Sequence, residues 1–316
     1  MNKIVNGCYP VMVIAYDKNG DVDYDAVKKL VKWYWDNGCQ GIFTSCQSTE
    51  IRFLSLADRV KVTKVTVDEA RRLAAEDKSR PPMCIVGSGH VSEDFEEQVT
   101  ELTQVWETGV DGLVLISNRM DIAQIGEDKW IEDTKKLIDR LPADATLGMY
   151  ECPQPYKRLL TEKMCKWMAE CGRFAFIKDT CCDVEMIARR LEIFKDSPVG
   201  IFNANGQTVL DTLKLGAKGY SGIMANFHPK LYSWLCDNWE TQPEKAEQLA
   251  QFMCMSAFTE GPVYPCSAKY SIAKYEGIDM EITARSSDFR LLTDYHKRWI
   301  EKMHNMAERY YETICR

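Results

Sequence analysis

Phe174-Ala175-Phe176-Ile177-Lys178-Asp179-Thr180 is the stretch that decides the fold. Four apolar residues, two of them aromatic, run directly into a lysine, and such a short apolar run is typical of a buried strand in a parallel sheet. Lys178 then stands at the carboxyl end of that strand, where parallel α/β folds bind their ligands. An ammonium held partly out of water has a lowered pKa and becomes an amine nucleophile that forms Schiff bases with carbonyl compounds. The alternative is a strand-end lysine whose charge simply reaches solvent.

Strand-like and helix-like segments alternate on both sides of this stretch. Asp23 is expected to cap the first helix and Ser92 the helix after the third strand. Eight strands alternating with helices predict a (β/α)8 TIM barrel, of class α/β, over residues 1–238. A doubly wound sheet is the alternative, but no Gly-x-Gly-x-x-Gly fingerprint follows an early strand. The expected strands cover residues 7–13, 41–44, 82–87, 112–116, 146–150, 174–180, 200–203 and 219–224.

From Trp239 onward the pattern is helical only, over residues 244–259, 267–276 and 288–314. No strand signal separates these segments. We therefore expect an appended C-terminal helical bundle over residues 239–316, packed on the barrel or on a neighbouring subunit.

The composition excludes several classes of protein. The 316 residues include 45% hydrophobic and 28% charged side chains, and the net charge of −7 argues against a nucleic-acid partner. No apolar stretch approaches the roughly 20 residues of a membrane helix, and the first seven residues lack an apolar signal core. We expect a cytoplasmic protein whose 13 cysteines are reduced thiols. The four histidines show no metal-binding spacing, so neither a metal nor another cofactor is expected.

In a barrel the site lies at the carboxyl ends of the strands. Lys178 and Tyr150 end consecutive strands, so their side chains are expected to converge. Other strand ends supply Gln47, Ser48, Thr49, Arg119, Asn203, Asn205 and Gly222.

These residues lie in motifs that resemble the dihydrodipicolinate synthase / N-acetylneuraminate lyase family of Schiff-base aldolases. The resemblance extends from Gly7 to about Arg285. The motifs follow one another at the family's spacing. They are Gly20-Asp21-Val22-Asp23, Gly38-Cys39-Gln40-Gly41, Tyr150-Glu151-Cys152-Pro153 for Y-N-x-P, Ile177-Lys178-Asp179-Thr180 for I-K-[DE]-[ST], and residues 216–226 for G-A-x-G-x-I-S-x-x-x-N.

The resemblance implies that Lys178 forms an imine with a 2-oxo acid such as pyruvate, while Tyr150 shuttles a proton. It also implies that a loop after the second strand holds the substrate carboxylate, and a homo-oligomer, a dimer or a tetramer. The family's G-[TS]-T-G-E loop is Cys46-Gln47-Ser48-Thr49-Glu50 here. Ser48 keeps a hydroxyl, whereas the bulkier Gln47 and Thr49 are expected to reshape the pocket and change the substrate, or else to weaken the activity.

Three departures bear on the substrate. Gln154-Pro155-Tyr156 stands where the synthases carry an arginine, and Ser117-Asn118-Arg119 stands where they carry P-[YF]-Y. Asn205-Gly206 replaces the acidic pair of the sialic acid lyases. These changes argue against both of these activities.

Two residues have more than one interpretation. Arg119 either pairs with a substrate carboxylate in bidentate fashion or is a surface arginine paired with Asp121. Glu151 serves either as a second acid/base or as a structural hydrogen-bonding group.

The sequence thus predicts a class I aldolase-type lyase that acts on pyruvate or another 2-oxo acid and an aldehyde, cleaving or forming a C–C bond. One alternative is a 2-keto-3-deoxy-sugar-acid dehydratase or an aromatic hydratase-aldolase that uses the same imine. The other is a non-catalytic barrel that binds a 2-oxo acid.

Overall fold

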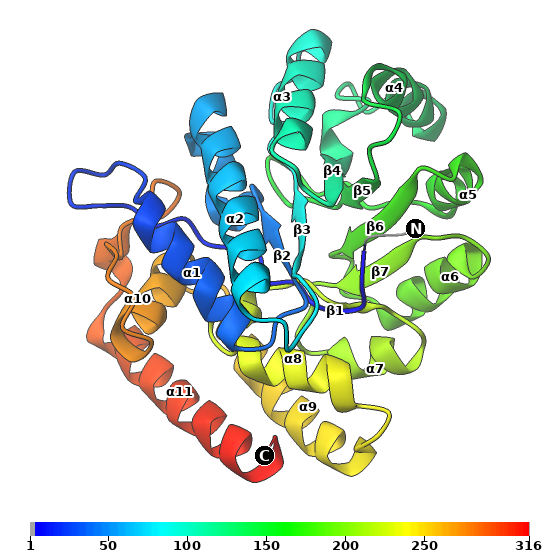
Figure 1. The fold of residues 1–316 in the computed structure, drawn as a ribbon. Coiled ribbons are helices and arrows are strands. Elements are labelled where there is room, and N and C mark those ends of the chain that lie inside the picture. Colours follow the sequence, from blue (N-terminus) through cyan, green and yellow to red (C-terminus); the bar gives the residue numbers. More distant parts are fainter. Residues whose placement is uncertain (1–3, 316) are drawn as a thin grey trace.

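Eight parallel strands form a barrel at the centre of the computed structural model, which describes residues 4–315 (Figure 1). Their order is β1-β8-β7-β6-β5-β4-β3-β2, and a parallel bridge between Val11 and Phe43 links the chain after β1 to β2. The predicted (β/α)8 barrel is therefore confirmed. The strands are β1 (Gly7–Cys8), β2 (Gly41–Thr44), β3 (Cys84–Gly87), β4 (Gly112–Ile116), β5 (Leu147–Tyr150), β6 (Phe174–Asp179), β7 (Gly200–Asn203) and β8 (Gly219–Tyr220).

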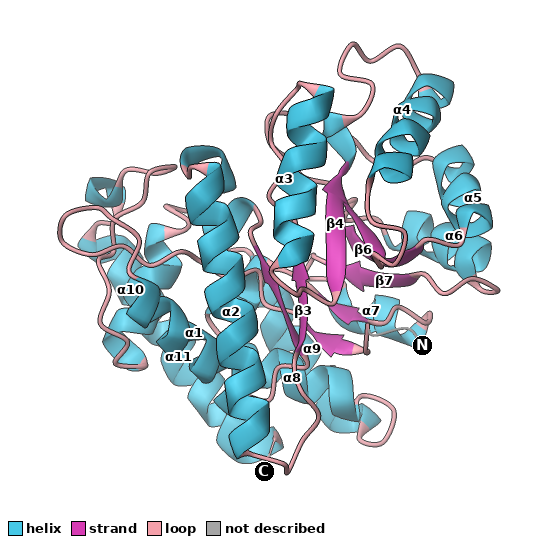
Figure 2. Cartoon of the chain, turned by 45° about the horizontal axis from the view of Figure 1, so that its top comes forward, coloured by secondary structure: helices cyan, strands magenta, loops and turns pink. Residues whose placement is uncertain are grey.

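Helices follow the strands and lie on the outside of the barrel, as Figure 2 shows. Short 3-10 turns after β2, β4 and β8 carry part of the carboxyl-end surface. The helices of the barrel are α1 (Tyr24–Asp36), α2 (Leu56–Glu76), α3 (Phe95–Glu107), α4 (Glu127–Arg140), α5 (Glu162–Cys171), α6 (Val184–Phe194), α7 (Val209–Lys214) and α8 (Pro229–Asn238).

Most helix ends follow local signals. Asp23 caps α1 as predicted, because its carboxylate accepts hydrogen bonds from the backbone N–H groups of residues 25 and 26. The predicted cap at Ser92 is wrong. Asp94 caps α3 instead, and the Ser92 hydroxyl accepts from the Asp94 N–H and donates to Glu97. An ionised carboxylate is the stronger acceptor for the free N–H groups of a first turn.

Three helices complete the chain after the barrel. Helix α9 packs against α7 and α8, and α11 packs against α8, α9 and α10. In Figure 1 the orange and red helices α10 and α11 lie beside α1 and α8. The boundary at residue 238 stays a prediction. The helices are α9 (Pro243–Ala257), α10 (Cys266–Tyr275) and α11 (Asp294–Ile314). Within residues 4–315, none of the helices is both long and apolar enough to span a bilayer.

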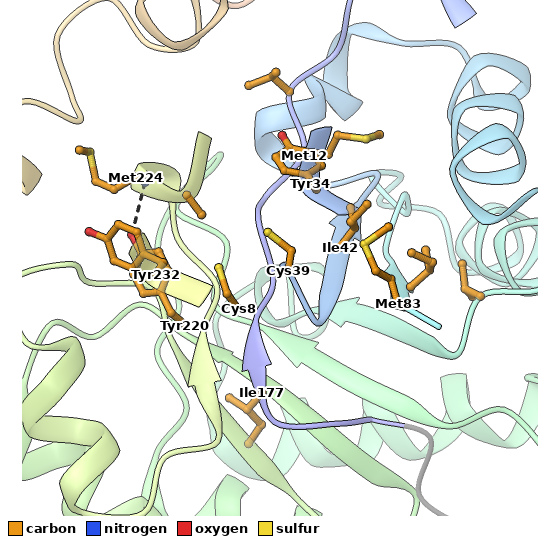
Figure 3. Packing of buried hydrophobic residues seen from close by; sticks show 14 of the residues in the cluster. Cys8, Met12, Tyr34, Cys39, Ile42, Met83, Ile177, Tyr220, Met224 and Tyr232 are labelled. Carbon is orange, nitrogen blue, oxygen red and sulfur yellow. Dashed lines mark hydrogen bonds between the residues drawn. The ribbon is translucent and has the colours of Figure 1, made fainter. Parts of the chain in front are cut away.

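The core has two layers. One layer fills the space between the strands and the helices, and Figure 3 shows part of it, with Tyr220 stacked on Tyr232 at 4.1 Å between ring centroids. The other fills the barrel, where Phe202 packs against Phe176 at 4.6 Å and against Tyr9 at 4.8 Å. These rings occupy the barrel interior below the carboxyl ends of the strands, so water is kept from the barrel axis.

Candidate active site

Lys178 and Tyr150 are direct neighbours at the carboxyl end of the barrel. They are register partners on β6 and β5, and the Lys178 Nζ lies 4.2 Å from the centre of the Tyr150 ring. Lys178 is 5% exposed, and burial lowers the pKa of its amine. Burial also raises the pKa of the Tyr150 phenol well above its usual range, so Tyr150 is a neutral proton donor at neutral pH. The structure thus brings an amine with a lowered pKa and a neutral phenol together.

A cavity of about 460 Å³ opens above these two side chains. Its volume lies in the range of small-molecule sites. Four of the other predicted site residues line it, namely Gln47, Ser48, Asn205 and Gly222. The residues 4–315 hold no group of three or more His, Cys, Asp or Glu side chains that is arranged for a metal ion.

The loop after β2 lacks the two glycines of the family pattern, and its positive φ angles fall elsewhere. The left-handed backbone falls on Ser45 (φ 47°) and Glu50 (φ 58°), and not on Cys46 or Thr49, where the family has glycine. The Gln47 side chain reaches the centre of the site, where its Oε1 accepts a hydrogen bond of 3.5 Å from the Tyr150 hydroxyl. Gln47 therefore lines the cavity and contacts the Tyr150 hydroxyl.

A chain of hydrogen bonds orients Ser48. Tyr34 donates to Asn226 at 2.5 Å, Asn226 donates to Tyr264 at 3.0 Å, and Tyr264 donates to Ser48 Oγ at 2.7 Å. Because Ser48 Oγ is an acceptor in this chain, its own hydrogen remains for a ligand in the cavity. A carboxylate is a suitable acceptor for that hydrogen.

Glu50 fixes the end of the same loop. It is fully buried, and its Oε2 lies 3.2 Å from Lys269 Nζ on α10. Its Oε1 accepts from the backbone N–H groups of Arg285 and Ser286 and from the Ser286 hydroxyl. The C-terminal helices and the segment between them thus hold the β2 loop in place.

A second buried cluster supports the lysine and the tyrosine from behind. Arg190 on α6 forms an ion pair of 2.8 Å with Glu151, the residue after Tyr150. It also pairs with Asp179, the residue after Lys178. Glu151 also accepts from the N–H groups of Leu160 and Thr180, so its role in the structure is hydrogen bonding. Burial raises the pKa of Glu151 to about 7, and the neighbouring Asp179 adds to this rise.

The structure places three predicted substrate-binding residues outside the cavity. Thr49 is buried and donates to the Met12 carbonyl, and Asn203 donates to Thr208 and Thr212. Arg119 is buried beside a separate hollow of about 260 Å³ and donates to the Val91 carbonyl at 3.2 Å.

The predicted alternative, a surface Arg119 paired with Asp121, is wrong. Its ion-pair partner is Glu93, at 3.5 Å, whereas Asp121 pairs with Arg158 at 2.7 Å. Arg119 ends the short turn after β4, residues 117–119, and lines the separate hollow and not the cavity above Lys178.

Gly222 lies after β8 and not within it, and the neighbouring chain comes too close to leave room for a side chain at this position. A Cβ atom there would meet the Ala204 carbonyl oxygen at 2.3 Å, so a larger residue does not fit. Asn205 lines the same side of the cavity, with its amide held by Gln207 and Thr208.

Among the residues of the cavity wall that the sequence interpretation did not name, several come from the part of the chain after the barrel. Glu260 and Tyr264 belong to the link between α9 and α10, and both line the cavity. No spacing ties this link to the barrel strands. A proline and two charged or aromatic residues in a turn (Glu260-Gly261-Pro262-Val263-Tyr264) are the sole local signal.

Comparisons with known proteins agree with this arrangement. The model of the dihydrodipicolinate synthetase family matches residues 5–287. A 4-hydroxy-tetrahydrodipicolinate synthase of Coxiella burnetii is 22% identical over 293 residues, covering 90% of this chain and 94% of that protein.

Solved structures share the fold over nearly their whole length. A dihydrodipicolinate synthase from Acinetobacter baumannii, complexed with pyruvate, gives a TM-score of 0.82 at 18% identity, with 96% of this chain and 99% of that chain covered. A catalytic lysine mutant of the sialic acid aldolase of Ruminococcus gnavus gives 0.83 at 17% identity, with 99% and 100% covered. With its lysine and tyrosine side by side in the barrel, the chain belongs to the dihydrodipicolinate synthetase family and is a lyase of the Schiff-base aldolase type.

Proposed function

We propose that the protein forms an imine between Lys178 and pyruvate or a larger 2-oxo acid, and then makes or breaks a carbon–carbon bond next to the imine. The observation that carries the proposal is the buried Lys178 amine beside the Tyr150 hydroxyl in a cavity of small-molecule size. The amine attacks the ketone carbon, and water leaves after proton transfer. The resulting protonated imine accepts the electron pair of the breaking bond.

Tyr150 would transfer a proton to or from the substrate oxygen when a hydroxyl group leaves or forms there. Gln47 orients the phenol through its hydrogen bond, and Ser48 together with nearby N–H groups would hold the carboxylate of the 2-oxo acid. No metal or organic cofactor is needed for these steps, because the imine itself is the electron sink.

The reaction of the named synthase relatives is a less favoured candidate. The names of these relatives support it. Against it stands the segment after Tyr150, where Gln154 and Pro155 replace the arginine of the synthases. The basic residues that follow are engaged, since Lys157 donates to the Thr180 carbonyl and Arg158 pairs with Asp121.

Borohydride trapping tests the proposal. We expect that incubation with pyruvate and borohydride gives a reduced adduct on the peptide that contains Lys178, and that Lys178→Ala gives none. An adduct with a longer 2-oxo acid alone would place the substrate among the larger acids. The absence of an adduct with every 2-oxo acid would refute the proposal and leave a barrel without imine chemistry.

Turnover separates the lyase from a binding protein. A native protein that forms the adduct and also condenses or cleaves members of an aldehyde panel is the expected lyase. An adduct without turnover on any aldehyde or hydroxylated acid would favour a non-catalytic 2-oxo-acid-binding barrel. The oligomer expected from the family is tested separately by light scattering, in which a monomer would contradict it.

A further inference from the structure

Glu260 differs from the other carboxylates near the imine lysine. Glu50 also lines the cavity, but both of its oxygens are occupied by Lys269, Arg285 and Ser286. Glu260 Oε2 is buried and has no hydrogen-bond partner among residues 4–315. A buried polar atom of this kind costs stability, so its retention in a ligand cavity calls for a ligand group.

The position of Glu260 fits a contact with substrate. Glu260 and Lys178 line the same cavity, and the charges of the two groups influence each other. None of the ion pairs within the described chain joins them, so the two groups face the cavity without neutralising each other at contact distance. Burial raises the pKa of Glu260 to about 7, which leaves much of it neutral near physiological pH.

The neighbouring charges select the chemical group that this carboxyl can accept. A cationic group of the substrate would lie near the protonated imine on Lys178 and be repelled. An anionic group would be repelled by the ionised fraction of Glu260. A neutral hydroxyl has a hydrogen to donate and meets neither repulsion.

We propose that Glu260 accepts a hydrogen bond from a hydroxyl group of the substrate, on the carbons beyond the 2-oxo acid that Lys178 holds. The inference rests on the proposed imine function. It makes the substrate a hydroxylated 2-oxo acid and makes Glu260 a specificity-determining residue from outside the barrel strands. A site that holds a hydroxyl in this way rejects the analogue that lacks it, because the carboxyl oxygen is then left unpaired.

Two acids with the same carbon chain test the inference. The probes are 4,5-dihydroxy-2-oxohexanoate and 2-oxohexanoate, trapped on Lys178 with borohydride, and the half-saturating concentration is measured for each. Both the intact adduct and the pyruvate adduct left by cleavage are counted. The ratio of the two half-saturating concentrations is the readout, because it cancels any change in the reactivity of Lys178 that a variant causes.

The native protein is expected to favour the dihydroxy acid by about 10- to 100-fold, as the cost of leaving a buried acceptor without a hydrogen-bond partner implies. Glu260→Leu should bring this preference close to one, and Glu260→Gln, which keeps a carbonyl acceptor, should retain part of it. Glu240→Gln in the exposed turn after α8 is the matched control and should keep the native ratio.

The outcomes distinguish the two proposals. A native protein that gives adducts with both acids, and an unchanged ratio in Glu260→Leu, would overturn the role of Glu260 while leaving the imine function intact. A native protein that gives no adduct with either acid or with pyruvate would overturn both. Circular dichroism of each variant shows whether the fold is retained, and pyruvate trapping serves the same purpose for the site.

Discussion

Replacing Arg190 with methionine should destabilise the fold far more than the same replacement of a surface arginine that also forms an ion pair. Arg190 is 1% exposed and forms ion pairs with Glu151 and Asp179. Its loss leaves two carboxylates buried beside each other, and removal of one partner of a buried ion pair costs about 3–5 kcal/mol. For 316 residues the entropy of unfolding is roughly 0.7 kcal/mol/K, so the melting temperature should fall by about 5–8 °C.

Arg140 is the matched control for this experiment. It makes a bidentate contact with Glu96, at 2.8 and 2.9 Å, but the two side chains are 49% and 66% exposed. Exposed pairs contribute about 0–1 kcal/mol, so Arg140→Met should change the unfolding free energy by no more than that. Urea titrations followed by circular dichroism measure both variants under the same conditions.

The pH dependence provides a second check on the same reasoning. In native protein the pKa of Glu151 is already raised to about 7, and loss of Arg190 should raise it further. A carboxyl whose folded-state pKa is raised gains folding stability as the pH falls through that pKa toward the unfolded value. The loss of unfolding free energy caused by Arg190→Met should therefore become smaller as the pH is lowered from about 8.5 to about 6. Equal losses in both arginine variants, or a deficit that grows as the pH falls, would refute the argument.

Three further outcomes follow from the site. Tyr150→Phe should lower turnover by about 10²-fold or more while the protein still folds, because the hydroxyl proposed to carry the proton is lost. Stopped-flow kinetics with a coupled assay measures this, and unchanged turnover would contradict it. The rate of pyruvate trapping should rise with pH and reach half its maximum below the ordinary lysine pKa, because burial favours the neutral amine of Lys178; a midpoint at or above about 10.4 would contradict this. Lys269→Met should lower the free energy of unfolding by about 3–5 kcal/mol and raise the half-saturating concentration of pyruvate, because Glu50 loses its counter-ion and the β2 loop loosens. Urea titration measures the first effect and borohydride trapping the second. An unchanged half-saturating concentration would show that the β2 loop does not depend on Lys269.

The barrel and the central pair of the site could be predicted because their signals are local. The apolar run of β6 and its terminal lysine are adjacent in the chain, and Tyr150 ends the preceding strand. Helix-ending glycines such as Gly38, Gly109 and Gly216 have positive φ as their position between helix and strand requires. These features depend on residues within one turn or one strand of each other.

The remaining features depend on how distant segments pack. Arg119 follows β4 as predicted, but it lines the separate hollow and not the cavity above Lys178. Glu260 and Tyr264 reach the cavity from a link that has no sequence relationship to the strands. The competition between Ser92 and Asp94 for the start of α3 was likewise settled by charge and by hydrogen bonds within the turn, which a spacing rule does not rank.

The two contacts that hold the β2 loop can form only late in the synthesis of the chain. Ser48 can contact Tyr264 only after 216 more residues have been made, and Glu50 can contact Lys269 only after 219 more. At about 5–20 residues per second, a ribosome needs roughly 10–40 s to make that interval. A nascent chain that already contains every barrel strand therefore still lacks the partners of Ser48 and Glu50. The order that these two contacts give to the β2 loop therefore depends on residues 264 and 269, which are made after the last barrel strand.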